Sequence, residues 1–283
     1  MYKNNWQQLE KVFNSELHEA LLQQHHAAQF VAMVGRHLLP QESDDSNTNM
    51  EYLSGSGLLA GNMLPNGQRI ALNPIQLRLY FLDNEGECGN EMNLEGKSKE
   101  EVFEELKTTL ASLEFDVLEF KNELHYKLPD HFLDKGSSFI VDDPELFKEN
   151  TKFRHNAEIV LNEIVATFDG GGTVKIWPHH FDTGALFIIS EDENGDASQS
   201  IGIGFAIPDS MVDEPYYYLS FWSEKPVEGL NKLPSLDAGE WMVPDWSGAI
   251  LKHSDIVKTG ADEQYEYVKS FYISGINILL DRL

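Results

Sequence analysis

The sequence of 283 residues contains a single cysteine, Cys88, so no internal disulfide bond can form. Cys88 has no basic neighbour in the sequence that would stabilise a thiolate, and we interpret it as a loop residue. The chain also lacks an apolar run of the length that a membrane span needs, and its N-terminus lacks the apolar core of a signal peptide. We therefore expect a cytoplasmic protein without a membrane partner.

Basic residues are scarce: 21 lysines and arginines face 47 aspartates and glutamates, which gives a formal net charge of −26. A field of this sign repels nucleic acid and anionic lipid, so neither is an expected partner, whereas a small molecule fits. Nothing in the sequence sets an oligomeric state. The acidic residues occur in short clusters, such as residues 42–45 and 191–193, which is typical of a solvated surface. Hydrophobic residues make up 41% of the chain, enough for a globular core.

Glycine-rich segments are present, but none has the form of a phosphate-binding loop. Residues 170–173, Gly-Gly-Gly-Thr, follow a predicted helix instead of opening one and lack the Gly-Lys-Ser/Thr ending. Gly202 and Gly204 lie inside an apolar strand, without the third glycine of a dinucleotide fingerprint. The sequence therefore requires no cofactor, and a divalent metal is the one candidate that its polar residues offer.

Hydrophobic periodicity predicts long helices that alternate with groups of antiparallel strands. A capping box at Ser98 opens the second helix, and the pairs Asn66-Gly67 and Asn194-Gly195 are typical hairpin turns. Period-three and period-four apolar positions predict helices at residues 15–39, 98–113, 143–168 and 262–281. Apolar alternation and short apolar runs predict strands at residues 75–81, 173–177, 184–190, 200–207 and 215–222.

This order of elements predicts an α+β fold with antiparallel sheets backed by long helices. The chain divides into an N-terminal half (1–125), a connection (126–142) and a C-terminal half (143–283). Both halves run long helix, antiparallel strands, helix, which indicates an internal duplication of one helix–strands–helix unit. Strands and helices do not alternate regularly, so a doubly wound parallel sheet is disfavoured.

The segment from Trp177 to Gly184 crowds chemically active groups onto a short stretch between two apolar runs. In an extended chain His180 and Asp182 share a face, whereas the neighbouring His179 points the other way. An imidazole and a carboxylate could ligate a metal or act as acid and base, so His180 and Asp182 are the candidate catalytic and metal-binding pair. Alternatively, Asp182 makes an Asx-type turn that joins two strands, and the imidazoles hydrogen-bond to backbone.

A metal would need further ligands from distant parts of the sequence. His25 and His26 on the first helix and His155 on the third are the candidates for this role. On helical spacing His25 and His26 do not converge, and we interpret the histidines of the first helix as surface or boundary residues.

Residues 201–207 form a strand in which one face carries large apolar side chains and the other carries only Gly202, Gly204 and Ala206. Either a helix packs unusually close to this bare strip or a ligand occupies the space above it. The next strand places Tyr216, Tyr218 and Trp222 on one side, and aromatic side chains with polar tips are suited to a pocket wall. The candidate ligand-binding residues are therefore Trp177, His179, Gly202, Gly204, Tyr216, Tyr218 and Trp222.

Three segments carry a resemblance to known proteins: residues 177–182 (Trp-Pro-His-His-Phe-Asp), Val34-Gly35-Arg36, and Gly204-Phe205 followed by residues 215–218 (Pro-Tyr-Tyr-Tyr). Together they resemble a group of uncharacterised bacterial proteins classed as a domain of unknown function. The resemblance covers most of the chain and is best at Asp182, whereas related members often have other residues at His179 and His180. It implies a fold and a prokaryotic origin, and it implies no chemistry.

These observations favour a protein that binds a small ligand in a cleft of the C-terminal half. One alternative is a metal-assisted hydrolase in which His180 and Asp182 hold an ion that activates a water molecule. A second alternative is a module whose function is association with another protein.

Overall fold

The computed structural model describes residues 3–283, which form two compact units. The first, here called the N-terminal unit, comprises Ser15–Thr151 and Ile176–Phe181. The second, the C-terminal unit, comprises the described residues up to Asn14 together with Lys152–Lys175 and Asp182–Leu283. Within residues 3–283, no helix is long and apolar enough to cross a membrane.

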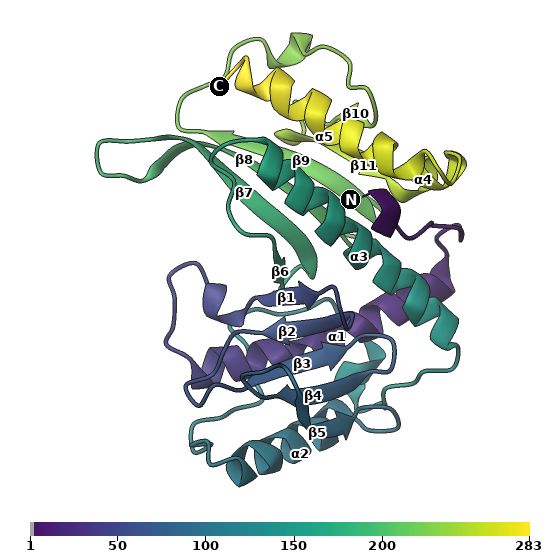
Figure 1. Cartoon of the computed structure of the whole chain (residues 1–283), viewed down its shortest axis with the longest axis vertical. Helices are drawn as coiled ribbons and strands as arrows, with labels where there is room; N and C mark the ends of the chain where they lie inside the picture. Colours follow the sequence, from purple (N-terminus) through teal and green to yellow (C-terminus); the bar gives the residue numbers. More distant parts are fainter. Residues whose placement is uncertain (1–2) are drawn as a thin grey trace. The chain divides into compact units, whose positions relative to one another are not determined.

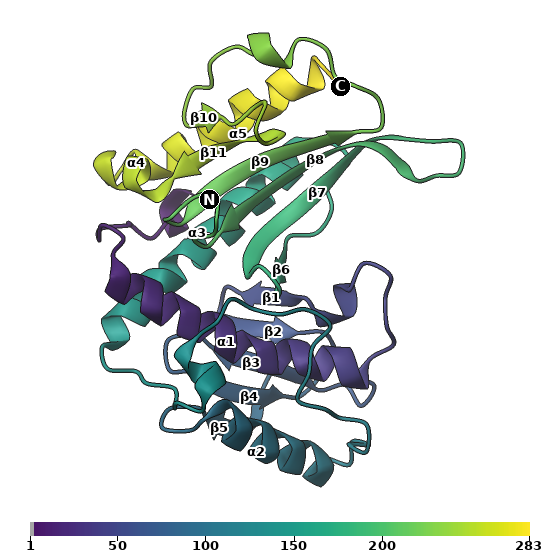
Figure 2. The same ribbon diagram turned by 180° about the vertical axis from the view of Figure 1, so that it is seen from behind.

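The N-terminal unit is an antiparallel sheet with a long helix against one face (Figure 2). Helix α1 (Ser15–Leu38) contacts strands β2 and β3. The strands lie in the order β6-β1-β2-β3-β4-β5. Strands β1 to β5 are therefore neighbours in the same order as in the sequence. Their bounds are Met50–Leu53 (β1), Leu58–Gly61 (β2), Arg69–Asn73 (β3), Arg78–Leu82 (β4), Cys88–Asn93 (β5) and Lys175–Trp177 (β6), and helix α2 (Lys99–Ser112) follows β5.

In the C-terminal unit, helix α5 and the part of α3 from Lys152 onward lie on one face of the strands (Figure 1). Phe153 of α3 stacks on Phe205 with ring centroids 5.4 Å apart, and Tyr272 of α5 packs edge-on against Tyr217. The strand order is β10-β11-β9-β8-β7. The bounds are Pro144–Thr167 (α3), Asp182–Glu191 (β7), Ala197–Ala206 (β8), Tyr216–Ser223 (β9), Glu240–Trp241 (β10), Gly248–Lys252 (β11), His253–Lys258 (α4) and Gln264–Leu280 (α5).

The mixed α+β class with antiparallel sheets is confirmed, and the long helices begin and end close to their predicted positions. Ser98 accepts a hydrogen bond from the backbone N–H of Glu101, whose side chain accepts one from the Ser98 backbone, so the capping box is present. The boundary between the units lies inside α3, because its residues before Lys152 belong to the N-terminal unit.

Three local predictions are wrong. The strand predicted at 75–81 begins only at Arg78, because the Asn73 side chain accepts hydrogen bonds from the next backbone N–H groups and Leu77 adopts φ = 45°. Cys88 opens strand β5 instead of lying in a loop. His25 and His26 are buried, at 3% and 2% exposure, because α1 is covered on more than one side.

The bare strip of β8 is covered by neither a helix nor an open cavity directly above its glycines. Gly204 pairs with Tyr218 and Gly202 with Ser220 on β9, and these two side chains lie over the glycines. A Cβ at Gly204 would collide with the ring of Tyr218, and one at Gly184 would come within 2.7 Å of its hydroxyl. The glycines therefore provide the space in which the Tyr218 ring lies flat across the sheet.

This packing predicts that Gly204→Ala destabilises the protein by about 1–3 kcal/mol, because the added methyl group displaces the Tyr218 ring. Gly55→Ala is the matched control, since its Cβ would meet no atom within 4 Å, and its cost should stay within about 0.5 kcal/mol. Denaturant unfolding of both variants measures the difference. Equal free energies of unfolding for the two variants would contradict the close approach of the Tyr218 ring to Gly204.

Candidate functional site

The predicted site residues fall in two units. Trp177, His179 and His180 belong to the N-terminal unit, whereas Asp182 begins strand β7 of the C-terminal unit. The remaining predicted residues lie on the two following strands of the C-terminal unit, at Gly202, Gly204, Tyr216, Tyr218 and Trp222.

The turn at Pro178–Phe181 is anchored on helix α1. Phe181 is fully buried with φ = 54°, and its ring stacks on His25 with centroids 5.0 Å apart and planes 3° apart. The Pro178 carbonyl lies 2.9 Å from His25 Nε2 and accepts a hydrogen bond of 3.0 Å from Gln29 Nε2. A bulky residue with positive φ is strained, and the stacked ring and the bonded carbonyl hold it in this conformation. His25 therefore fixes the shape of the turn.

The two histidines of the turn are exposed and their rings are close together. Because residues 178–181 form a turn and not an extended strand, the rings of His179 and His180 lie 4.4 Å apart instead of on opposite faces. The His179 ring lies 5.9 Å from Tyr126 and 6.4 Å from Trp177. His179 is thus a neighbour of both Tyr126 and Trp177.

Asp182 takes part in a buried charge network of the C-terminal unit. Its Oδ2 atom accepts a hydrogen bond of 2.8 Å from the Tyr218 hydroxyl. Arg154, 2% exposed on α3, donates a hydrogen bond of 2.9 Å to Thr183 Oγ1. Burial lowers the pKa of Arg154, and the negative charge of Asp182 opposes this shift. Asp182 is therefore the counter-charge of the buried Arg154 guanidinium. Burying a guanidinium costs much less free energy when a carboxylate is paired with it.

Tyr216 and Trp222 flank this network on β9. The Tyr216 hydroxyl donates a hydrogen bond of 2.8 Å to Asp209, and burial, followed by the hydrogen bond to Asp209, raises the pKa of Tyr216. Trp222 is 51% exposed. The predicted wall residues therefore bond to carboxylates or face solvent.

The geometry around Asp182 favours anion–cation pairing within the chain over metal binding. In the described part of the chain, no group of three or more His, Cys, Asp or Glu side chains is arranged to hold a metal ion. A guanidinium near Asp182 also disfavours a second cation there. His155 is half-buried, and its Nε2 atom lies 2.8 Å from the Asn5 carbonyl oxygen.

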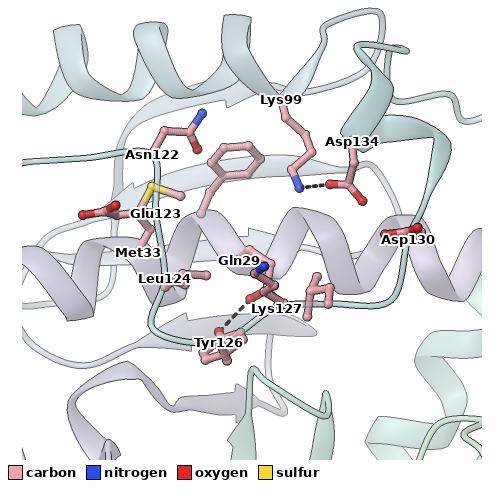
Figure 3. Close-up of a pocket in the computed structure, with 12 residues that line it drawn as sticks. Gln29, Met33, Lys99, Asn122, Glu123, Leu124, Tyr126, Lys127, Asp130 and Asp134 are labelled. Carbon is pink, nitrogen blue, oxygen red and sulfur yellow. Dashed lines mark hydrogen bonds and ion pairs between the residues drawn. The ribbon is translucent and has the colours of Figure 1, made fainter.

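A pocket of about 290 Å³ opens along helix α1 in the N-terminal unit (Figure 3). Helix α1 contributes Gln29, Phe30 and Met33, and Lys99 comes from the first turn of α2. The rest of the wall is built by the segment from Asn122 to Asp134, which includes Tyr126. No sequence pattern marks this pocket, because most of the wall segment lies in the predicted connection at residues 126–142.

Four polar groups of the pocket have partners within the lining: Gln29, Tyr126, Lys99 and Asp134. The Tyr126 hydroxyl donates a hydrogen bond of 2.7 Å to Gln29 Oε1 (Figure 3). Burial, and secondarily the charge of Asp45, raises the pKa of Tyr126, so the hydroxyl stays protonated at neutral pH. On the other side, Lys99 Nζ pairs with Asp134 Oδ1 at 2.7 Å. These contacts preorganise both sides of the pocket.

Next to Lys99 lies a row of titratable groups, of which His26 and His131 are buried. Lys99 Nζ is 3.4 Å from His26 Nδ1, and the His26 ring stacks on His131 at 4.7 Å. His131 Nε2 in turn lies 3.2 Å from Glu19. Burial, then the charges of Lys99 and His131, lowers the pKa of His26 to about 4. His26 is therefore neutral at pH 7, in agreement with a lone pair on Nδ1 that accepts from Lys99.

The lowered pKa of His26 predicts a loss of stability in mild acid. In the unfolded chain the imidazole titrates near its ordinary value, so protons favour the unfolded state as the pH falls from there toward the folded pKa. Relative to His26→Gln, the wild type should lose about 2 kcal/mol of unfolding free energy between about pH 7.5 and pH 5. Urea unfolding of both proteins measures this, and a difference independent of pH would contradict a neutral, buried His26.

Comparison of the chain with protein-family models, with curated proteins and with solved structures found no match. The geometry of the pocket and of the buried networks therefore carries the functional argument.

Proposed function

We propose that the protein binds a small organic ligand in the pocket along helix α1. The observation that carries this proposal is the pocket's composition: its lining joins apolar side chains with polar ones that are already held in place. The apolar side chains are Phe30, Met33, Leu124 and Leu128, and Gln29, Tyr126 and Lys99 are the polar ones fixed by hydrogen bonds or an ion pair. Ligand sites combine apolar surface with fixed polar groups in this way. Its volume of about 290 Å³ corresponds to the small end of such sites.

The location differs from the cleft expected in the C-terminal half. There, Tyr218 and Ser220 occupy the space above the glycines, and Asp182 is committed to Tyr218 and to the charge of Arg154. A metal-assisted hydrolase at His180 and Asp182 is therefore the weaker proposal, because Asp182 already interacts with these two groups. His179 keeps a place in the proposal, because its ring neighbours Tyr126 of the pocket wall, and Trp177 is connected to the pocket through His179.

Preorganisation supports the same conclusion. Gln29 is 4% exposed and uses its amide fully: Nε2 donates to the carbonyls of His25 and Pro178, and Oε1 accepts from Tyr126. The wall residue Tyr126 is thus held in place before any ligand arrives. A site that is already ordered loses less conformational entropy on binding.

The proposal predicts that a ligand found by thermal shift loses its effect in Leu128→Trp, because the indole fills the pocket. Leu118→Trp is the matched control, since Leu118 is 84% exposed and lies outside the pocket lining. A compound at about a hundredfold excess over its dissociation constant stabilises the folded state by about 2.7 kcal/mol. That stabilisation should persist in Leu118→Trp and disappear in Leu128→Trp. Ligands that stabilise both variants equally would place the site elsewhere.

We also infer that the two units derive from one duplicated helix–strands–helix element. Each half of the sequence places a helix of 24 residues before antiparallel strands and has a further helix after them. The strands β1–β5 are neighbours in sequence order, as are β7–β9, and the C-terminal unit differs by the short strand β10 outside β11. A superposition of α1 and β1–β3 on α3 and β7–β9 tests the inference, and helices on opposite faces would contradict it.

A further inference from the structure

We infer that the ligand of the α1 pocket is a small organic cation, an ammonium group carried on an apolar body. This inference rests on the proposed function and adds the chemical class of the ligand. It follows from the polar groups of the lining that have no internal partner, from the sign of the local charge and from the aromatic walls.

Two carboxylates of the lining are uncommitted. Within residues 3–283, the side chains of Glu123 and Asp130 make no hydrogen bond or ion pair. Both residues are exposed, and they lie at opposite ends of the drawn side chains in Figure 3. The Asn122 amide donates to Glu100, which leaves its oxygen directed to no donor in the described chain. Hydrogen-bond acceptors are therefore in excess at the mouth of the pocket.

The donors of the lining are fewer. Gln29 Nε2 is used by two backbone carbonyls, and the Tyr126 hydroxyl proton is used by Gln29. Lys99 is neutralised by Asp134 at 2.7 Å. Lys127 is the one uncommitted cation among the lining residues that the structure describes. A ligand that donates hydrogen bonds finds more partners here than a ligand that accepts them.

The charge of the pocket lining also favours a cationic ligand. The lining carries three carboxylates, Glu123, Asp130 and Asp134, against two ammonium groups, Lys99 and Lys127, so its formal charge is negative. The chain as a whole carries −26, and such a field raises the local concentration of cations and lowers that of anions. A carboxylate or phosphate ligand would meet repulsion both at long range and at the site.

The apolar part of the lining suits the body of such a cation. Phe30 and Tyr126 present aromatic rings, and an ammonium group near an aromatic face gains about 0.5–1 kcal/mol at an exposed site. Met33, Leu124 and Leu128 supply further apolar surface. The volume of about 290 Å³ is too small for a peptide and fits a single aromatic or branched aliphatic group.

The test is isothermal titration of the full chain with three probes that share a phenyl group: phenethylammonium, 2-phenylethanol and 3-phenylpropionate. The cation should bind at least about fivefold more tightly than the alcohol, because its ammonium group adds a carboxylate contact and a cation–π contact. The carboxylate should bind more weakly than the alcohol. Added salt should weaken binding of the cation and leave binding of the alcohol unchanged.

Single substitutions test where the ligand binds and whether its charge is positive. Glu123→Gln and Asp130→Asn should each weaken phenethylammonium by about two- to fivefold, and Lys127→Gln should strengthen it by a similar factor. Glu104→Gln, at an exposed position of α2 outside the lining, is the control for the long-range field and should leave affinity unchanged. All four residues are exposed, so the variants should unfold at the wild-type midpoint.

The outcomes separate this inference from the proposed function. If the cation and the alcohol bind equally and Leu128→Trp abolishes both, the inference that the ligand is a cation is overturned. The pocket then remains a ligand site. Tighter binding of 3-phenylpropionate would do the same. If none of the three probes binds, the cation inference fails; if in addition no stabilising compound depends on Leu128, the proposed function fails with it.

Discussion

The buried amide of Gln29 joins three segments that are distant in the sequence. It lies on α1, donates to the carbonyl of Pro178 in the turn before β7, and accepts from Tyr126 of the segment between α2 and α3. A buried amide that loses one of these partners costs about 1–3 kcal/mol, so the three segments are held together. The wall of the pocket depends on this constraint, because the bond to Gln29 is the hydrogen bond that fixes the Tyr126 hydroxyl.

In the C-terminal unit, too, a buried polar group has partners in segments that are distant in the sequence, and here the group is charged. Arg154 is buried, and Asp182 and Thr183 at the start of β7 provide its compensation. Tyr218 reaches Asp182 across Gly204 and Gly184, so the glycines of the sheet and the carboxylate belong to one arrangement. The residue types that suggested chemistry in the sequence, an aspartate beside histidines and a glycine strip beside tyrosines, here satisfy buried charge and packing.

Local sequence patterns predicted the helices and turns. They did not predict the contacts between residues that are distant in the sequence. The capping box at Ser98 and the hairpin pair Asn194-Gly195 depend only on neighbouring residues, and both are found where expected. Burial of His26 depends on His131 and Lys99, which are far away in the sequence. The pocket escaped prediction for the same reason, since α1, the start of α2 and residues 122–134 carry no shared pattern.

The most direct test of the ligand site is a methyl NMR titration of the protein with phenethylammonium. Met33 lines the pocket, whereas Met63 is 49% exposed on a loop outside the pocket lining, and Met33→Leu assigns the first signal. A ligand between Phe30 and Tyr126 should shift the Met33 methyl resonance in a saturable way and leave that of Met63 in place. A Met33 signal that stays unchanged while phenethylammonium binds would contradict the account.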